Sequence, residues 1–295
     1  MKKCNFCQKS QKYKIFTIDF PSFRHLDYKK ISSRSTFLKC NKWGLITVLQ
    51  KNQKKKIEKM FKSSMYSRSN QTNQKKYFKK NLFYRSQIQS LFISKKIKDN
   101  SNILDIGCFD GRLLLFLSNK LKKSKFTGFE INKKMKKIFP NKKNFFFIEN
   151  LEKLKNSKFD AVIFSHSVMY FDKLNLLLRK IHDLLDKNGK LFIQIPDIIK
   201  NPLNVLMGDQ GSIFTVNSMK NICSLTGFKI VNIEKKIFKR EILFTIIKKI
   251  SGNNSLSILK DYTLENSIIF LNRFKDKILK NFKNKEYSIL GTTAN

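Results

Sequence analysis

The sequence lacks any apolar run long enough to cross a bilayer. Its opening, MKKCNFCQKSQKYKIFTIDF, is basic but has no apolar core of the kind that secretion signals carry. We therefore expect a cytoplasmic protein with no membrane span. Because the cytosol is reducing, its five cysteines are expected as thiols or metal ligands and not as disulfides.

Acidic residues and arginine are scarce. The chain has 61 Lys and Arg against 21 Asp and Glu, for a formal net charge of +40, which is typical of proteins that bind nucleic acid. Only eight of the basic residues are arginine, the side chain that binds phosphate with a two-pronged fork, and the lysines are dispersed along the whole chain. Codon bias toward A and T gives the same composition without any partner. Nucleic acid is therefore the less favoured partner, and the oligomeric state stays open.

Four segments differ in composition. With 295 residues and 41% hydrophobic content, the chain can bury one full-sized core and a smaller appendage. Residues 1–60 hold short apolar pieces and predict a small β-rich module, whereas residues 61–100 are polar, basic and helical in pattern, as in a connector or lid. Residues 101–250 alternate strands with helices, and residues 251–295 form a helical extension.

The alternating segment predicts an α/β fold. Strands that are apolar throughout and separated by helices indicate a parallel sheet covered on both faces. The last two β-segments, 228–235 and 241–247, leave almost no room for a helix between them, so we expect an antiparallel hairpin there. The prediction is a doubly wound, Rossmann-like, mostly parallel sheet with a terminal hairpin. Its other strands are expected at 102–107, 125–131, 144–148, 159–165 and 190–195, and its helices at 112–120, 133–138, 174–185 and 216–226.

The stretch NILDIGCFDGRLLLFL, residues 102–117, has the pattern of a cofactor cradle. Gly107 and Gly111 remove the β-carbons that would keep a ligand from the backbone, and the helix that follows points free N–H groups toward it. The middle glycine of a dinucleotide G-x-G-x-x-G is absent. Asp105 can hold a cationic amino group, and Glu130, twenty-five positions later, can accept both hydroxyls of a ribose. A nucleoside with an amino-acid tail, S-adenosylmethionine, fits both acids.

On these residues, 101–250 resembles a class I S-adenosylmethionine-dependent methyltransferase. IGCFDGRLL is similar to the IGxxDGxLL form of the zinc-ribbon methyltransferases, which include nucleotide-sugar C-methyltransferases. The resemblance implies that the first acid and both glycines line the methionine moiety, the second acid binds ribose, and the Glu-Asn pair after the third strand reaches the adenine amine. The fourth strand, in FDAVIFSHSVMYF, then runs past the transferable methyl group. The residues assigned to the cofactor are Asp105, Gly107, Cys108 (a small filler), Gly111, Glu130, Glu149, Asn150 and Ser165.

The amino terminus resembles a zinc ribbon with one ligand missing. Cys4, Cys7 and Cys40 match its metal ligands, but Trp43 stands at the fourth position. A structural zinc ion takes four ligands in a closed tetrahedron, and His25 could complete the set. Two interpretations stay open: a zinc site, or a ribbon that packs without metal.

The segment that supplies the catalytic base in the sugar C-methyltransferases has no histidine counterpart in this sequence. Their Tyr-His-Glu-His-x-x-Tyr-Phe segment aligns with residues 207–214, which contain no histidine. Methylation of oxygen or nitrogen needs less help, because it is an in-line displacement in which proximity supplies much of the rate. His166, at the carboxyl end of the fourth strand, is the first candidate base, or a residue that only shapes the cofactor pocket. Asp209 and Tyr170 are further candidates.

Three functions follow. The first is methylation of a small polar acceptor such as a sugar or nucleotide sugar. An RNA methyltransferase is the second, favoured only by charge, since the fourth strand does not end in the Asn-Pro-Pro-Tyr of amine-methylating enzymes. The third is a non-catalytic cofactor-binding or scaffolding protein. Tyr66 and Arg68 are expected near the site, and the carboxyl-terminal residues resemble the beginning of a second domain.

Overall fold

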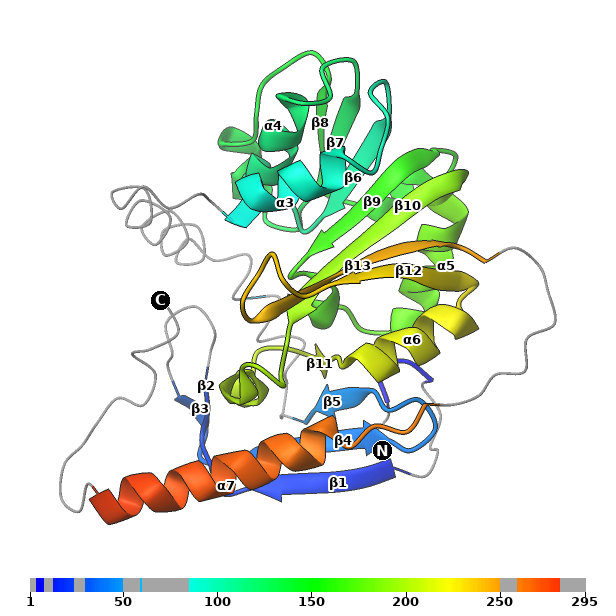
Figure 1. The fold of residues 1–295 in the computed structure, drawn as a ribbon. Helices are drawn as coiled ribbons and strands as arrows, with labels where there is room; N and C mark the ends of the chain where they lie inside the picture. Colours follow the sequence, from blue (N-terminus) through cyan, green and yellow to red (C-terminus); the bar gives the residue numbers. More distant parts are fainter. Residues whose placement is uncertain are drawn as a thin grey trace.

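The computed structural model describes residues 4–7, 13–23, 30–49, 59, 85–249 and 259–281. Its centre is a seven-stranded sheet of order β12-β13-β10-β9-β6-β7-β8 (Figure 1). The five strands from β8 to β10 are parallel, and β13 is antiparallel to both β10 and β12. The predicted Rossmann-like sheet with a terminal antiparallel hairpin is therefore confirmed. The strands are β6 (Asn102–Ile106), β7 (Lys125–Phe129), β8 (Phe145–Ile148), β9 (Phe159–Ser165), β10 (Leu185–Pro196), β12 (Phe228–Glu234) and β13 (Glu241–Lys248).

Helices cover both faces of this sheet. On one face, α3 (Arg85–Ser94) and α4 (Arg112–Ser118) bury their apolar residues in a cluster that includes Ile103 of β6. On the other, α5 (Leu174–Leu184) and α6 (Val216–Leu225) pack into a cluster that includes Leu104. Adjacent residues of one strand thus face opposite layers, which is why the strands are apolar throughout.

Several elements differ from their expected bounds. The segment expected as a helix at 133–138 is a 3₁₀ turn, η1 (Lys133–Lys137), in which only Met135 is buried and gives little packing to lengthen it. Strand β10 begins earlier than expected, because Leu185 already pairs with Phe159 before a shift in register. Further short turns are η2 (Leu151–Leu154), η3 (Val168–Tyr170) and η4 (Pro202–Leu206).

The amino-terminal residues form a second, antiparallel sheet of order β1-β4-β5-β11. Its last strand comes from the segment that follows β10 of the large sheet. The expected amino-terminal β-rich module is therefore completed by residues from much later in the sequence. The expected boundary near residue 60 stays a prediction. The strands are β1 (Tyr13–Ile18), β4 (Ser35–Cys40), β5 (Ile46–Val48) and β11 (Ser212–Ile213), with a separate hairpin of β2 (Ser22–Phe23) and β3 (Lys30–Ser32).

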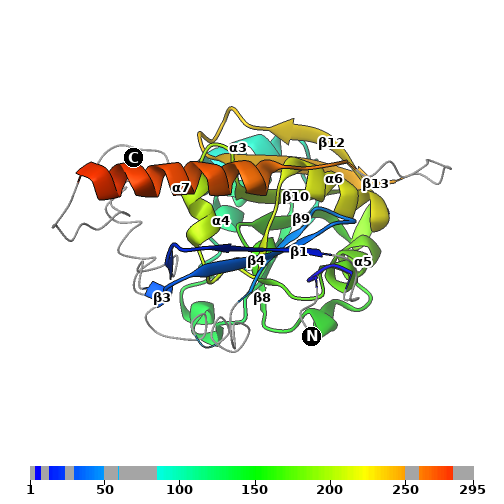
Figure 2. The same ribbon diagram turned by 90° about the horizontal axis from the view of Figure 1, so that it is seen from below.

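Helix α7 (Thr263–Asn281) runs along the small sheet (Figure 2). Its Leu264 and Leu271 are buried in one cluster with Phe37 of β4. At the start of the helix, Glu265 accepts hydrogen bonds from Lys39 Nζ at 2.7 Å. In the described part of the chain, no helix is long and apolar enough to cross a membrane.

Candidate functional site

The loop between β6 and α4 depends on its glycines. Gly107 and Gly111 have φ values of 79° and 72°, in the left-handed region. A β-carbon on Gly107 would lie 2.6 Å from Cβ of Ser167, and one on Gly111 would lie 2.6 Å from the ring of Phe139. Any side chain at either position would therefore be strained and obstructed.

Asp105 is a buried carboxyl group at this edge of the sheet. Its side chain is 2% exposed, and Oδ1 has no hydrogen-bond partner within the described part of the chain. Burial, with Glu130 and Asp110 nearby, raises the pKa of Asp105 to about 8. A buried carboxyl oxygen without a partner is costly, and a bound ammonium group would satisfy it.

Glu130 follows β7 and joins two loops. Its Oε2 accepts a hydrogen bond from the N–H of Phe109 at 3.2 Å, and its Oε1 accepts one from the N–H of Asn132 at 2.9 Å. Burial raises its pKa. Because β6 and β7 are paired and parallel, the two expected acids lie at neighbouring strand ends.

The remaining expected cofactor residues differ in where their side chains point. Cys108 is buried in the core beside Gly128, and burial raises the pKa of its thiol. After β8, Glu149 lies 3.3 Å from Lys133 Nζ, and Asn150 Oδ1 accepts from the N–H of Glu152 to cap η2. Their roles toward a cofactor stay predictions.

A row of polar side chains lies on the α3 face of the sheet, at the carboxyl edge of the parallel strands. This row contains Asp105 of β6, Ser165 of β9 and Gln194 of β10. Each of them lies two residues after an apolar residue of the same strand that is buried against α3 and α4. Antiparallel β13 begins with Glu241, two residues before buried Leu243. Strand alternation places these residues on one face.

Helix α3 meets this row. Ser165 Oγ donates to Gln89 Oε1 at 3.0 Å, and Arg85 Nη2 lies 2.8 Å from Glu241 Oε1. Gln89 is fully buried, and its Nε2 has no hydrogen-bond partner within the described residues.

His166, the first residue after β9, is the base candidate and has φ 55°. Its backbone N–H donates to the carbonyl of Gln194 at 3.1 Å, and the Nε2 atom of its ring lies 3.1 Å from Glu241 Oε2. The same Oε2 accepts from the Gln194 amide. Although burial opposes it, His166 and Arg85 together with this amide lower the pKa of Glu241 to about 2.

Sequence reasoning missed Arg85, Gln89, Gln194 and Glu241. The sequence offers one signal for them: each is a polar residue at a position where the periodicity of its helix or strand predicts an apolar, buried one.

Tyr170 and Asp209 lie on neighbouring segments. Tyr170 ends η3, and the N–H of Gly211 donates to the carbonyl of Met169 at 2.9 Å, so residues 207–214 run beside η3. Buried Asp209 follows Gly208, whose N–H donates to the carbonyl of Phe23 in the β2–β3 hairpin. The residues expected nearby, Tyr66 and Arg68, and the possible ligand His25 lie outside the described residues.

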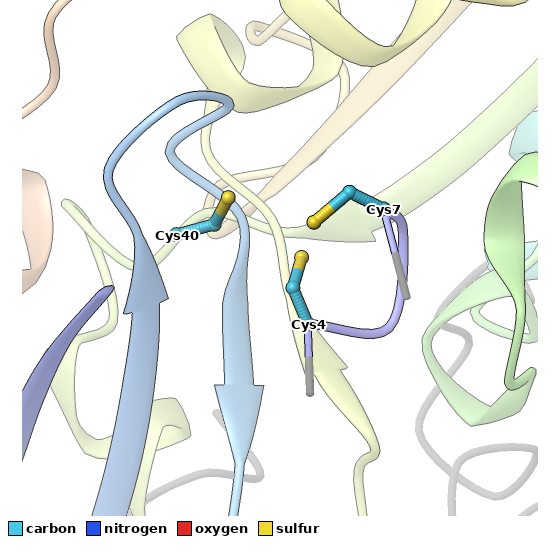
Figure 3. A group of neighbouring side chains, drawn as sticks. All are labelled: Cys4, Cys7 and Cys40. Atoms are coloured by element: carbon cyan, nitrogen blue, oxygen red, sulfur yellow. The ribbon is translucent and has the colours of Figure 1, made fainter. Parts of the chain in front are cut away.

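The three expected metal ligands converge (Figure 3). The sulfur atoms of Cys4, Cys7 and Cys40 lie within 4.8 Å of one another. A hydrogen bond from Cys4, with backbone N–H groups of Trp43 and Lys42, lowers the pKa of Cys40 to about 6. The Cys4 pKa is raised, chiefly by that same hydrogen bond.

The expected fourth ligand position is apolar. Trp43 is 8% exposed and packs edge-on against Phe6, with ring centroids 6.3 Å apart. Three thiols therefore remain, a donor set that suits a thiophilic metal.

Comparisons with known proteins agree with this fold. Among curated proteins, (S)-coclaurine N-methyltransferase of Papaver somniferum is 29% identical over 107 residues, 34% of this chain and 30% of that protein. An uncharacterized protein of Methanocaldococcus jannaschii is 31% identical over 144 residues, 48% of this chain and 54% of that one. The matches thus span about half, or less, of each relative.

Among solved structures, the plantazolicin methyltransferase BpumL in complex with SAH has a TM-score of 0.50 at 15% identity, covering 66% of this chain and 95% of that one. This likeness concerns the fold alone. A methyltransferase domain family matches residues 78–233. Because that match spans more than half of the chain, the protein belongs to the methyltransferase domain family, with the fold of class I S-adenosylmethionine-dependent methyltransferases.

Proposed function

We propose that the chain transfers a methyl group from S-adenosylmethionine to a hydroxyl or amino group of a small polar acceptor, such as a sugar or nucleotide sugar. The observation that carries the cofactor assignment is the buried Asp105 oxygen without a partner, beside a loop that admits no side chain at Gly107 or Gly111. An amino-acid ammonium group would pair with that oxygen, and the two glycines let the loop pack closely against Ser167 and Phe139 beside it.

The chain's residues divide the work of binding. Asp105 holds the ammonium group, and Glu130 accepts from ribose hydroxyls while it keeps the loop in place. Glu149 and Asn150 border the adenine, Cys108 fills the space behind the loop, and Ser165 lines the path toward the acceptor. When bound, S-adenosylmethionine supplies an electrophilic methyl group on a sulfonium, whose sulfur takes the bonding electron pair as the methyl group leaves.

On the acceptor side, His166 takes the proton that the attacking oxygen or nitrogen must lose. Its place beside Ser167, which abuts Gly107, puts it next to the cradle. Tyr170 and Asp209, on segments that touch each other, border the acceptor.

We also propose that Cys4, Cys7 and Cys40 hold a zinc ion. Sulfur atoms around a tetrahedral zinc lie about 3.8 Å apart, given Zn–S bonds of about 2.3 Å, so the present cluster needs only a small contraction. The fourth ligand would come from outside these three residues.

Calorimetric titration of the full chain with S-adenosylmethionine, in phosphate and in Tris at pH 7, tests the cofactor assignment. We expect micromolar binding and release of a proton, because Asp105, with its raised pKa, would ionise against the incoming ammonium group. Proton release appears as a difference in binding enthalpy between the two buffers.

Asp105→Asn should bind more weakly and release no proton, and Glu130→Ala should bind more weakly. Glu152→Gln, which alters an exposed ion pair, is the matched control. Absence of binding by folded wild-type protein would overturn the proposal. Tight binding with no methylation of sugars, nucleotide sugars or amines would instead favour a non-catalytic protein.

A further inference from the structure

Glu241 is a buried carboxylate that the sequence pattern does not explain. It begins β13, where the following residues are almost all apolar, and its side chain is 14% exposed. Burying such a charge costs free energy unless donors surround it. Arg85 of α3 and Gln194 of β10 supply two of them, and His166 at the end of β9 brings its Nε2 to 3.1 Å from Oε2.

These partners divide between the two carboxylate oxygens. Arg85 lies 2.8 Å from Oε1, whereas Gln194 and His166 both face Oε2. The main chain of His166 is fixed as well, because its backbone N–H donates to the Gln194 carbonyl. The ring therefore meets Glu241 at the edge of the sheet where β6 carries the other buried acid, Asp105.

We infer that Glu241 is a positioning residue for His166: it keeps the proton on the ring nitrogen that faces it and so leaves the other ring nitrogen free to accept a proton from the acceptor. The inference rests on the proposed function in giving His166 the role of base. The proton moves from the attacking O–H or N–H group to the free nitrogen, while the Glu241 carboxylate stays ionised and stabilises the imidazolium that results.

The charged groups around His166 agree with this arrangement. Glu241 faces it from β13, and Arg85 faces the far oxygen of Glu241 from α3, so Arg85 keeps the carboxylate ionised without occupying the oxygen that meets the imidazole. A low pKa of Glu241 accords with this set of contacts.

A simpler role for Glu241 would be to anchor α3 through Arg85. Two variants distinguish this anchoring role from the positioning role. Glu241→Ala removes both contacts, whereas Arg85→Met breaks only the α3 ion pair and leaves the contact with His166.

The test is long-range ¹H–¹⁵N NMR of the full chain labelled at histidine, which shows which ring nitrogen carries the proton. The chain has three histidines, and the signal lost in His166→Asn identifies this one. We expect one dominant tautomer, protonated at Nε2, in wild type and in Arg85→Met, and a mixture in Glu241→Ala. Should Glu241→Ala fail to fold, Glu241→Leu, which is close in volume, is read in the same way.

A mixture of tautomers in the wild type, or an unchanged tautomer in the folded Glu241 variant, would overturn the inference. Because this measurement needs neither cofactor nor acceptor, it is independent of the proposed function, which fails separately if S-adenosylmethionine does not bind. Once an acceptor is known, Glu241→Ala should lower kcat at least about tenfold, in the range typical of losing acid–base assistance, with KM for S-adenosylmethionine little changed.

Discussion

Asn5 Nδ2 donates a hydrogen bond to the carbonyl of Gly211 at 3.0 Å, across 206 positions of sequence. The same amide donates to Ser212 Oγ at 2.9 Å. Asn5 lies between two of the converging cysteines, and its own carbonyl accepts from the N–H of Leu174 at the start of α5. The cysteine turn is thus tied to the segment that borders the proposed acceptor site.

Asn5→Ala should lower the free energy of unfolding by about 2–3 kcal/mol, because it leaves the Gly211 carbonyl and the fully buried Ser212 hydroxyl without this donor. Hydrogen exchange should also quicken at Val48, whose N–H donates to Gly211. Urea denaturation and exchange measured by mass spectrometry check both. The exposed Asn188→Ala should change stability by less than about 0.5 kcal/mol, and equal effects of the two variants would contradict the role given to Asn5.

The contribution of Asp105 to the stability of the ligand-free protein should fall as pH rises from about 5 to 8. Asp105 has a folded-state pKa near 8, above its ordinary value of 3.8, so the folded protein binds more protons than the unfolded chain in this window. Its contribution is complete at low pH and is lost as pH climbs through the folded pKa. One such proton gives a slope of up to about 1.4 kcal/mol per pH unit.

Asp105→Asn should flatten that slope and be more stable than wild type at pH 8. Some slope should remain, because burial also raises the pKa of Glu130. Urea denaturation at several pH values measures the difference. Parallel pH profiles for the two proteins would show that Asp105 does not hold its proton in the fold.

Gly111→Ala should cost more than backbone strain alone. Gly44 offers a matched control, because its φ of 70° is nearly that of Gly111, yet an added β-carbon there would meet nothing closer than 3.8 Å. Gly44→Ala should therefore lose about 1 kcal/mol. Gly111→Ala, whose new methyl would lie 2.6 Å from the Phe139 ring, should lose about 3 kcal/mol.

The same pair of variants tests the cradle. S-adenosylmethionine affinity should fall at least about tenfold in Gly111→Ala, because the loop must shift, and should be unchanged in Gly44→Ala. Denaturation and calorimetry measure the two effects. Similar losses of stability in both variants would mean that the loop yields to the methyl group.

Local pattern predicted the large sheet because each strand is an apolar run bounded by turns, and the two acids at the ends of β6 and β7 follow from strand spacing alone. The small sheet was harder. Strand β11 has two residues, and it pairs with β5 some 165 positions earlier, which no local pattern records. Glu241 was missed for a similar reason, since its partners come from three elements that are distant in sequence.

Trp43→Cys should increase affinity for metal. The indole stands where a fourth zinc ligand is expected, and the backbone N–H of Trp43 already donates a hydrogen bond to the Cys40 sulfur. A fourth thiolate there would replace a ligand that wild type must take from outside its three cysteines. The loss of indole packing against Phe6 should still lower the stability of the metal-free variant.

Metal content by mass spectrometry, cobalt spectra and competition with a chelator would follow these changes. Wild type should bind one metal ion with three sulfur ligands, Trp43→Cys should bind more tightly with four, and Cys40→Ser should bind weakly or not at all. The opposite outcome would be that wild type takes up no zinc when zinc is added and that Trp43→Cys binds zinc no more tightly. The three cysteines would then be a thiol cluster that packs without metal.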